Sequence, residues 1–284
     1  MNILITGANG QLGNEMRILG AQQSQHKLFY TDVEDLDITN KSAIYDYVSN
    51  HDIELIVNCA AFTAVDRAEN EEPLARLLNA LAVLNLGEVA TEKGAKIIHI
   101  STDYVFDGKA YTPYREIDCP NPASAYGRTK LEGEQLLMQA CPAAVIIRTA
   151  WLYSEFGNNF VKTMLRLGRE RDSLNVVFDQ IGSPTYALDL AQAIMTIINA
   201  DKWIAGVYHF TNEGVCSWYD FTKAIHQLAG IECNVTPIRS EQYPTPTERP
   251  HYSVLDKAKI KEDYGVAVPH WYEALQRCVS KLTN

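Results

Sequence analysis

The sequence is short of positive charge: its 284 residues include 25 lysines and arginines against 35 aspartates and glutamates, a formal net charge of −10. Such a charge repels phosphate-rich surfaces, so we expect neither a nucleic acid nor a membrane surface as a partner. An anionic substrate would need a local basic pocket rather than attraction by the whole molecule.

Cysteine is also sparse, and its spacing argues against a metal site. The chain has no C-x-x-C pair and no metal-ligand spacing among its six cysteines. Free thiols are therefore the expected state, and those at a strand end (Cys59) and on a helix (Cys278) are expected to be buried. The cysteines are Cys59, Cys119, Cys141, Cys216, Cys233 and Cys278.

Long apolar runs, internal repeats and low-complexity tracts are missing as well. No apolar run approaches the ~18 residues of a membrane span. The short apolar run at the N-terminus has no basic segment before it, so we expect no signal peptide. These absences favour a cytoplasmic protein with no separable domains joined by a linker.

What is present is an alternation of strand-like and helix-like segments. Strands are expected at residues 2–5, 27–31, 55–59, 96–100, 145–148 and 207–210, and helices at 12–20, 40–50, 73–93, 124–139, 158–171 and 186–199, followed by a helix capped by Ser217 and terminal helices. This alternation predicts an α/β fold: a Rossmann-type doubly wound parallel sheet with a smaller C-terminal substrate-binding lobe. We expect residues 1–150 to form the dinucleotide-binding domain, with added strands from about 174–212, and residues 151–284 to form mainly the lobe.

A glycine-rich turn follows the first expected strand and opens the first expected helix. Gly7 and Gly10 would permit a tight turn and close approach of a pyrophosphate, while Gly13 would let helix and strand pack closely. Free N–H groups and the helix dipole would face the phosphates. The spacing is G-x-x-G-x-x-G rather than the common G-x-G-x-x-G. The alternative is a turn with no ligand.

An acidic residue ends the second expected strand. Asp32 is placed where a carboxylate typically receives the adenosine ribose hydroxyls of a dinucleotide. No arginine that could bind a 2′-phosphate lies between Thr31 and Arg67. The residues alone therefore favour NADH over NADPH, unless Asp32 is a solvated loop carboxylate.

One further strand end and one expected helix carry groups suited to proton transfer. Tyr126 and Lys130 are four residues apart, so a helix would place them on one face. An ammonium group near the phenol would favour its ionised form, lowering a pKa that is normally near ~10. Thr102 and Asp103 follow the fourth strand, and the carboxyl ends of parallel strands form the ligand-binding edge of such a sheet. An exposed helix face is the alternative.

Several segments taken together resemble the extended short-chain dehydrogenase/reductase family. They are Thr6–Gly13 (TGANGQLG), Ala60–Asp66 (AAFTAVD), Ser101–Gly108 (STDYVFDG), Tyr126–Lys130 (YGRTK), Arg148–Tyr153 (RTAWLY), Gly157–Phe160 (GNNF), Asp179–Thr185 (DQIGSPT) and Arg249–Asp256 (RPHYSVLD). The resemblance covers nearly the whole chain. The Tyr/Lys pair is shared by the wider superfamily, but the other blocks are typical of members that use NADH or NADPH to reduce the C4 ketone of dTDP-4-dehydro-6-deoxy-L-mannose, giving dTDP-L-rhamnose.

The resemblance also implies roles for individual residues. The catalytic positions are Thr102, Tyr126 and Lys130. The cofactor positions are Gly7, Gly10, Gln11, Leu12, Gly13, Asp32, Asp37, Ile38, Ala61, Phe62, Thr63, Tyr126 and Lys130. The substrate positions are Thr102, Asp103, Trp151, Asp66 and Arg249. Leu12, Ile38 and Trp151 are equally interpretable as core residues. Arg249 lies in a proline-stiffened loop and is the cation best placed to grip a diphosphate, with a surface salt bridge as the alternative.

One departure from the family pattern concerns magnesium. Some members form a dimer in which carboxylates from three helices bind this ion. Glu15 fits the first position, but Leu188 and Lys281 fall at the other two, and neither suits a hard oxygen-seeking cation. No metal site is therefore expected, and the chain is predicted to be a monomer or a homodimer.

Two other kinds of function share these motifs. A nucleotide-sugar epimerase or dehydratase of the same fold would keep the glycine loop and the Tyr/Lys pair. A dehydratase usually has additional acidic groups beside Thr102, whereas Asp103 and Tyr104 follow here. A non-catalytic dinucleotide-binding subunit, such as the regulatory subunit of methionine adenosyltransferase, would not need Thr102, Tyr126 and Lys130 together.

Overall fold

The computed structural model describes residues 1–22 and 25–283, and its largest element is a six-stranded sheet. The strands are β1 (Asn2–Thr6), β2 (Lys27–Thr31), β3 (Leu55–Asn58), β4 (Lys96–Thr102), β5 (Val145–Thr149) and β10 (Gly206–His209). Their order is β10-β5-β4-β3-β1-β2, and every neighbouring pair is parallel. The predicted doubly wound α/β fold is confirmed.

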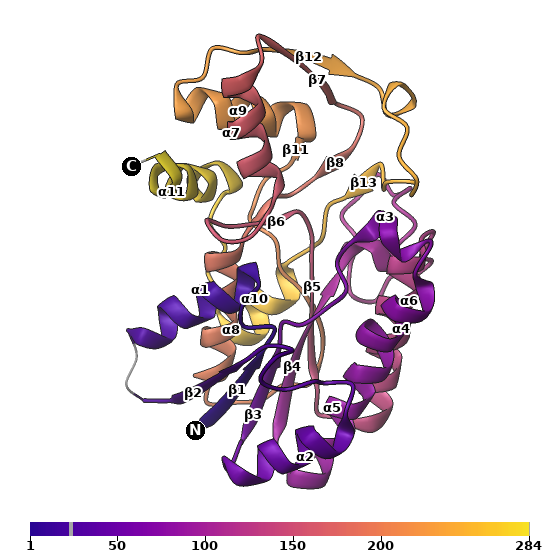
Figure 1. Ribbon diagram of the computed structural model, residues 1–284, viewed down its shortest axis with the longest axis vertical. Coiled ribbons are helices and arrows are strands. Elements are labelled where there is room, and N and C mark those ends of the chain that lie inside the picture. The colour runs from indigo at the N-terminus through magenta and orange to yellow at the C-terminus, as the bar shows by residue number, and fades with distance from the viewer. Residues whose placement is uncertain (23–24, 284) are drawn as a thin grey trace.

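Helices cover both faces of this sheet (Figure 1). One face packs against α1 (Gln11–Ala21), α8 (Ala187–Ile198) and α10 (Ala258–Tyr264), and the other against α2 (Lys41–Asn50), α5 (Ala82–Lys93) and α6 (Ala125–Ala140). Chain order reverses between β1 and β3, which lie side by side although β2 comes between them in sequence. A crevice forms at the carboxyl ends of the strands at such a point, and ligands of α/β sheets bind there.

Capping residues explain where several of these helices begin and end. The side chain of Asn40 accepts a hydrogen bond from Ala43 N at the start of α2, and Ser124 accepts one from Gly127 N at the start of α6. Gly94 ends α5 in the left-handed conformation, with φ of 68°. Such caps satisfy backbone groups that the helix itself leaves unpaired.

One helical segment is more apolar than the sequence suggested. It runs through α4 (Glu72–Arg76), the π-helical turn η1 (Leu77–Leu81) and α5. By length and composition alone, Glu72–Lys93 is apolar enough to cross a membrane, so the expectation that no run approaches this length was wrong. Half of its most apolar window is buried inside the protein, and it packs against α6. The apolar character therefore serves the core beneath the sheet.

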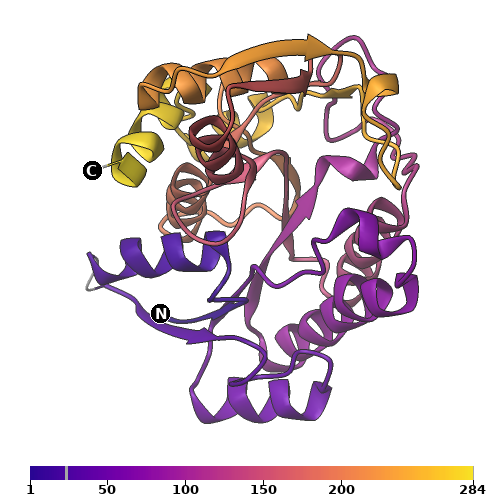
Figure 2. The ribbon, with the colours of Figure 1, turned by 45° about the horizontal axis from the view of Figure 1, so that its top comes forward.

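The C-terminal lobe is built from three helices and several short strands. Helices α7 (Phe160–Glu170), α9 (Trp218–Ala229) and α11 (Trp271–Thr283) pack together, and β7 (Ser173–Val177) runs parallel to β12 (Asn234–Ile238) along one edge (Figure 2). Shorter elements are α3 (Val65–Ala68), β6 (Leu152–Tyr153), β8 (Ile181–Gly182), β9 (Thr185–Tyr186), β11 (Cys216–Ser217), β13 (Tyr252–Ser253), and the 3₁₀ turns η2 (Asp103–Val105) and η3 (Ser240–Gln242). Of the residues after 150, α8, β10 and α10 pack with the large sheet, while β7 belongs to the lobe.

All six cysteines are free thiols, as expected. Cys278 is buried on α11, whereas Cys59 after β3 is only partly buried and Cys119 is exposed.

Candidate active site

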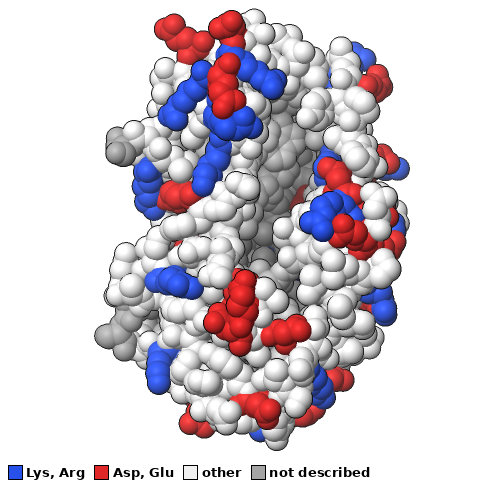
Figure 3. Space-filling view, viewed as in Figure 1, with Lys and Arg blue, Asp and Glu red and all other residues white. Residues whose placement is uncertain are grey.

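A cleft of about 890 Å³ opens at the carboxyl ends of the parallel strands. In the space-filling view, the hollow between the sheet domain and the lobe has largely uncharged walls, with charged side chains on its rims (Figure 3). Most residues singled out from the sequence line this cleft: Gly7, Gly10, Gln11, Leu12, Gly13, Asp32, Asp37, Ile38, Ala61, Thr63, Thr102, Asp103, Tyr126, Lys130 and Trp151. Phe62, Asp66 and Arg249 do not.

The glycine-rich turn brings backbone to backbone at one end of the cleft. Gly7 has φ of 64°, and a Cβ added there would lie 2.6 Å from Ala60 N. A Cβ on Gly13 would lie 2.5 Å from Ala8 Cα, so both positions require glycine. Gly10 caps α1 with no side-chain hydrogen bond, which leaves the first N–H groups of this helix to a ligand. The turn therefore fits the diphosphate of a dinucleotide.

Asp32 lies beside this turn at the end of β2. Its Oδ2 accepts a hydrogen bond from Asn9 N at 2.9 Å, and its Oδ1 accepts one from Val33 N at 2.9 Å. These bonds fix the carboxylate against the phosphate-binding turn at the wall of the cleft. Within the described residues, the cleft lining includes no arginine that would pair with a 2′-phosphate.

Tyr126 and Lys130 stand on α6, almost fully buried, and both line the cleft. Burial raises the pKa of the Tyr126 phenol above its usual range, and a hydrogen bond with Thr102 opposes the shift. Burial also lowers the pKa of Lys130 to about 8, against the attraction of Glu134. Burial is the largest influence on the pKa of Tyr126, and Lys130 is not among the groups that shift it. The expectation that Lys130 lowers this pKa stays a prediction for the protein with its cofactor bound.

Thr102 and Asp103 lie where β4 ends beside Tyr126. Thr102 Oγ1 donates a hydrogen bond to Asp103 Oδ1 at 3.0 Å. Burial raises the pKa of Asp103 to about 6, and hydrogen bonds from Ser253 and Thr102 oppose the shift. A hydroxyl, a phenol and a buried carboxyl thus converge on one end of the cleft.

A second cleft, of about 840 Å³, lies between the sheet domain and the lobe. Arg249 and Asp66 are on its wall, where Arg249 Nη2 pairs with Asp66 Oδ2 at 2.6 Å and Nη1 donates to Tyr104 Oη at 3.3 Å. The two residues are 183 positions apart in sequence. Arg249 is therefore partly buried and already paired with a carboxylate. Arg171, at the end of α7, also lines this cleft.

Trp151 lies on the walls of both clefts. Its φ is 50°, a left-handed conformation that is unusual for a bulky residue. The indole stacks on Trp218 of α9, with ring centroids 3.5 Å apart. The backbone after β5 is thus held in an uncommon shape that turns a large aromatic ring toward the boundary of the clefts.

Three of the apolar cofactor positions are also core residues. Leu12 and Ile38 line the cleft, but each is less than 8 % exposed and packs in the core. Phe62 packs beside Tyr126 instead of lining the cleft, and its backbone N donates to Asn79 Oδ1 at 2.8 Å. Phe62 therefore packs against Tyr126 outside the lining of the cleft.

Sequence reasoning missed Tyr104, Trp218 and His99. Tyr104 meets the Tyr126 ring edge to face at 5.4 Å between centroids, and Trp218 supports Trp151. The Nε2 atom of His99 lies 3.3 Å from Lys130 Nζ. Tyr104 directly follows Asp103, which is a usable signal, but no sequence pattern connects His99 or Trp218 to the site.

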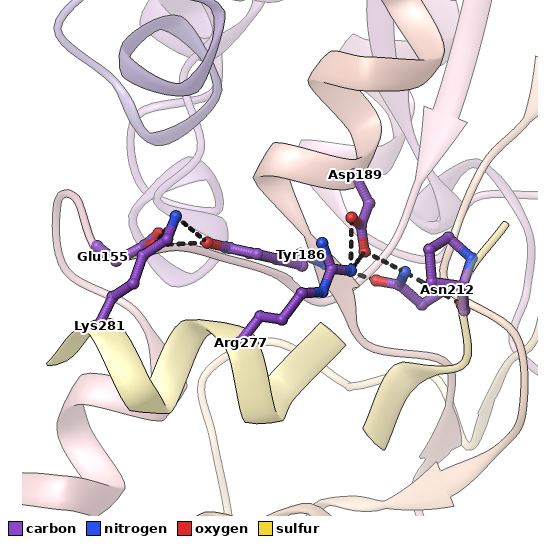
Figure 4. A network of polar contacts seen from close by, with 7 residues as sticks. Glu155, Tyr186, Asp189, Asn212, Arg277 and Lys281 are labelled. Atoms are coloured by element: carbon purple, nitrogen blue, oxygen red, sulfur yellow. Dashed lines mark hydrogen bonds and ion pairs between the residues drawn. The ribbon is translucent and has the colours of Figure 1, made fainter. Parts of the chain in front are cut away.

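The three positions compared with a family magnesium site have other surroundings here. Glu15 is fully buried, Leu188 packs in the lobe, and Lys281 on α11 pairs with Glu155 Oε1 at 2.7 Å. Lys281 also donates to Tyr186 Oη, and Arg277 on the same helix pairs with Asp189 (Figure 4). Among residues 1–22 and 25–283, no group of three or more His, Cys, Asp or Glu side chains could hold a metal ion.

The doubly wound sheet, the glycine turn at the start of α1 and the Thr102, Tyr126 and Lys130 side chains in one cleft define an extended short-chain dehydrogenase/reductase. Comparisons with known proteins give the narrower group. The family model described as "RmlD substrate binding domain" matches residues 1–284. The chain therefore belongs to the dTDP-4-dehydrorhamnose reductase family.

Relatives resemble it over their whole length. A dTDP-4-dehydrorhamnose reductase of Aggregatibacter actinomycetemcomitans is 42 % identical, over 96 % of this chain and 97 % of the relative. The crystal structure of such a reductase from Clostridium acetobutylicum is 46 % identical, covers 100 % of both chains and has a TM-score of 0.96. The enzyme from Bacillus anthracis, in complex with NADP, is 39 % identical over 99 % of both chains, with a TM-score of 0.94.

Proposed function

We propose that this protein reduces the C4 ketone of dTDP-4-dehydro-6-deoxy-L-mannose with NADH or NADPH, giving dTDP-L-rhamnose. The observation that carries the proposal is the meeting of Thr102, Tyr126 and Lys130 with the N-terminal turn of α1 in one cleft. Full-length relatives with this activity in their names support it. An epimerase or dehydratase would share the cleft, but the family match favours reduction.

Each of the three catalytic side chains would have a separate role in the reduction of the carbonyl. Negative charge develops on the C4 oxygen as hydride arrives, and a hydroxyl hydrogen bond from Thr102 would stabilise it. The Tyr126 phenol, kept protonated by burial, would deliver the proton as general acid. Lys130, on the same wall, would hold the nicotinamide ribose.

The dinucleotide would lie along the cleft from α1 toward α6. The free N–H groups at the start of α1 would bind the diphosphate, and Asp32 would receive ribose hydroxyls. The remaining cofactor contacts would come from Gln11, Asp37, Ala61 and Thr63 on the same cleft. When bound, the cofactor supplies the hydride, which no side chain of the protein can supply.

The nucleotide end of the substrate would occupy the second cleft. Arg249 and Arg171 are cations on its wall and would face the diphosphate, with Trp151 at the boundary where the sugar meets the nicotinamide. For Arg249 to bind the diphosphate, it must give up part of its contact with Asp66. The Asp66 carboxylate and the diphosphate are both anions, and they would compete for the same guanidinium group. Asp103 would contact the sugar near Thr102.

Two further proposals concern the location of the protein and its oligomeric state. Six free thiols suit a reducing compartment, so we place the enzyme in the cytoplasm. Its oligomeric state is proposed as monomer or homodimer, and no nucleic acid or membrane partner is proposed.

The test is consumption of NADH or NADPH, followed by absorbance, with dTDP-4-dehydro-6-deoxy-L-mannose as substrate. The proposal predicts turnover dependent on the keto sugar and formation of dTDP-L-rhamnose. Dinucleotide binding without consumption would favour a regulatory subunit. Conversion of the sugar with no net consumption of cofactor would favour an epimerase or dehydratase.

A further inference from the structure

A chain of buried polar side chains runs beneath the cleft from β1 to α6. Its members are Thr6, Asn58, His99 and Lys130, each at most 1 % exposed. Thr6 Oγ1 donates to Asn58 Oδ1 at 2.7 Å, and Asn58 Nδ2 lies 3.0 Å from His99 Nδ1. On the other side of the ring, Nε2 lies 3.3 Å from Lys130 Nζ. The lysine is therefore connected to the strand that carries the phosphate-binding turn.

The orientation of the Asn58 amide follows from one backbone group. Ala60 N lies 3.1 Å from Asn58 Oδ1, and a backbone N–H can only donate. The atom facing it must therefore be the oxygen, which leaves Nδ2 facing His99. Nδ2 can only donate, so His99 Nδ1 must accept. A neutral imidazole that accepts at Nδ1 carries its proton on Nε2.

That proton points at Lys130. An ammonium has three donors and no acceptor, so a charged Lys130 would set N–H against N–H across the 3.3 Å contact. A neutral amine has a lone pair that accepts the His99 proton, while another N–H donates to Ile100 O at 2.7 Å. His99 does not relieve the conflict by gaining charge, because burial and the charge of Lys130 hold its pKa well below the usual range.

We propose that His99 is a positioning residue for Lys130, favouring the neutral amine by presenting its Nε2 proton. The other charged group acting on Lys130 is Glu134, one turn along α6, which favours the ammonium. Glu134 Oε2 pairs with Arg148 Nη2 of β5 at 2.6 Å, which reduces the attraction of Glu134 for the Lys130 ammonium. The other titratable residues of the cleft lining are Asp32, Asp37, Cys59, Asp103, Tyr104 and Tyr126. Burial acts on Lys130 in the same direction as His99.

The consequence for catalysis rests on the proposed reduction. After Tyr126 gives its proton to the C4 oxygen, the phenolate must regain one before the next turnover. A neighbouring lysine exchanges protons most readily when its two forms are close in free energy at the working pH. His99 would keep Lys130 near that balance, and a strongly basic lysine would release its proton less readily.

The first test needs no substrate. In protein labelled with ¹⁵N-histidine, we expect His99 to be neutral with its proton on Nε2 between pH 6 and 9, the signal being assigned by its loss in His99→Gln. Asn58→Asp keeps an acceptor for Thr6 and Ala60 but accepts from His99 Nδ1–H, so the proton should move to Nδ1. An Nδ1 proton in the natural protein would overturn the proposal.

The second test is the pH dependence of turnover. Reduction consumes a proton, so turnover falls as pH rises through the pKa of Lys130. In His99→Gln the amide can turn its oxygen toward Lys130, and in Asn58→Asp the His99 proton moves to Nδ1. In both variants this alkaline midpoint should therefore rise by roughly one pH unit, with KM values unchanged. The matched control is His209→Gln, another fully buried histidine, whose Nδ1 contacts Tyr114 O. An unmoved midpoint, or an equal movement in the control, would contradict a specific role for His99.

The two tests separate this inference from the proposed function. If the protein turns over no keto sugar but His99 carries its proton on Nε2, the activity fails and the contact with Lys130 stands. If turnover is normal but the proton is on Nδ1, the proposed activity stands and the role of His99 toward Lys130 fails.

Discussion

Tyr126 and Lys130 show how burial sets the chemistry of single residues in the cleft. In water the phenol and the ammonium have nearly equal proton affinities, with pKa values of ~10 and ~10.4. Desolvation disfavours both charged forms, so it raises the pKa of Tyr126 and lowers that of Lys130 to about 8. In the proposed reaction, the phenol would therefore keep its proton until a substrate oxygen with developing charge takes it.

Removing the Tyr126 hydroxyl tests this role. Tyr126→Phe keeps the ring and its contact with Tyr104, so cofactor affinity should survive. Turnover should fall by ~10²–10⁴, the usual worth of a general acid. Steady-state kinetics and cofactor titration measure the two effects separately, and near-normal turnover would exclude Tyr126 as the proton donor.

Asp32 leads to a prediction about the cofactor. Its carboxylate is fixed at the wall of the cleft, whose described lining contains no arginine for a 2′-phosphate. We expect kcat/KM for NADH to be at least equal to that for NADPH, measured at one salt concentration. A strong preference for NADPH, the form related to the NADP bound by the Bacillus anthracis relative, would mean that Asp32 does not contact the ribose.

Arg249→Lys tests how an acidic protein holds a diphosphate. Lysine keeps the charge but cannot reproduce a two-pronged grip, so KM for the nucleotide sugar should rise while NADH binding stays unchanged. Arg76→Lys is a matched control, since Arg76 is half exposed and paired with Glu132 on the surface. Unchanged constants in both variants would assign Arg249 to its pair with Asp66 alone.

At the scale of elements, α1 and α11 are joined through a buried carboxyl. Glu15 of α1 has 0 % exposure, and the carboxyl of Glu155 is the neighbouring group that acts on it most strongly. Burial, together with the adjacent Glu155, raises the pKa of Glu15 from 4.5 to about 8. Glu155 is paired with Lys281 of α11, so the helix that begins at the phosphate turn rests on the C-terminal helix through a protonated glutamate.

This proton makes stability depend on pH in a predictable direction. Between pH 4.5 and about 8 the folded protein holds a proton on Glu15 that the unfolded chain has released, so the free energy of unfolding falls as pH rises. Glu15→Gln removes the titration. Denaturant midpoints at pH 5.5 and 8.5 should show the variant gaining stability over the natural protein at the higher pH. The exposed control Glu170→Gln should show no such change, and equal behaviour of both variants would contradict the assignment.

Elements with local signals were predictable, and those defined by distant partners were not. The strands of the large sheet are short apolar runs between helices whose caps, such as Asn40, Ser124 and Gly94, are visible in the sequence. The two-residue strands of the lobe are too short to show periodicity. The left-handed backbone of Trp151 and the pairing of Arg249 with Asp66 depend on packing across the fold. The glycine turn and the strand-end residues could be found because parallel strands bring them to one edge.

At the scale of the whole molecule, the two clefts meet at Trp151, between a sheet domain suited to a dinucleotide and a lobe with cations for a nucleotide sugar. With a net charge of −10, the protein would hold anionic ligands through a few placed groups: the N–H groups at the start of α1 and the guanidinium groups of Arg171 and Arg249. Bringing two substrates together in this way converts hydride transfer into an effectively intramolecular step. We therefore expect direct hydride transfer between molecules held in adjoining clefts.

The most direct test of this hydride transfer uses reduced nicotinamide cofactor carrying deuterium at the transferable C4 position. The protein is incubated with this cofactor and dTDP-4-dehydro-6-deoxy-L-mannose, and the product is analysed by nuclear magnetic resonance and mass spectrometry. We predict one deuterium at C4 of dTDP-L-rhamnose for each cofactor oxidised. A sugar product without deuterium, or deuterium at any other carbon, would contradict the assignment of this protein as a C4 ketone reductase.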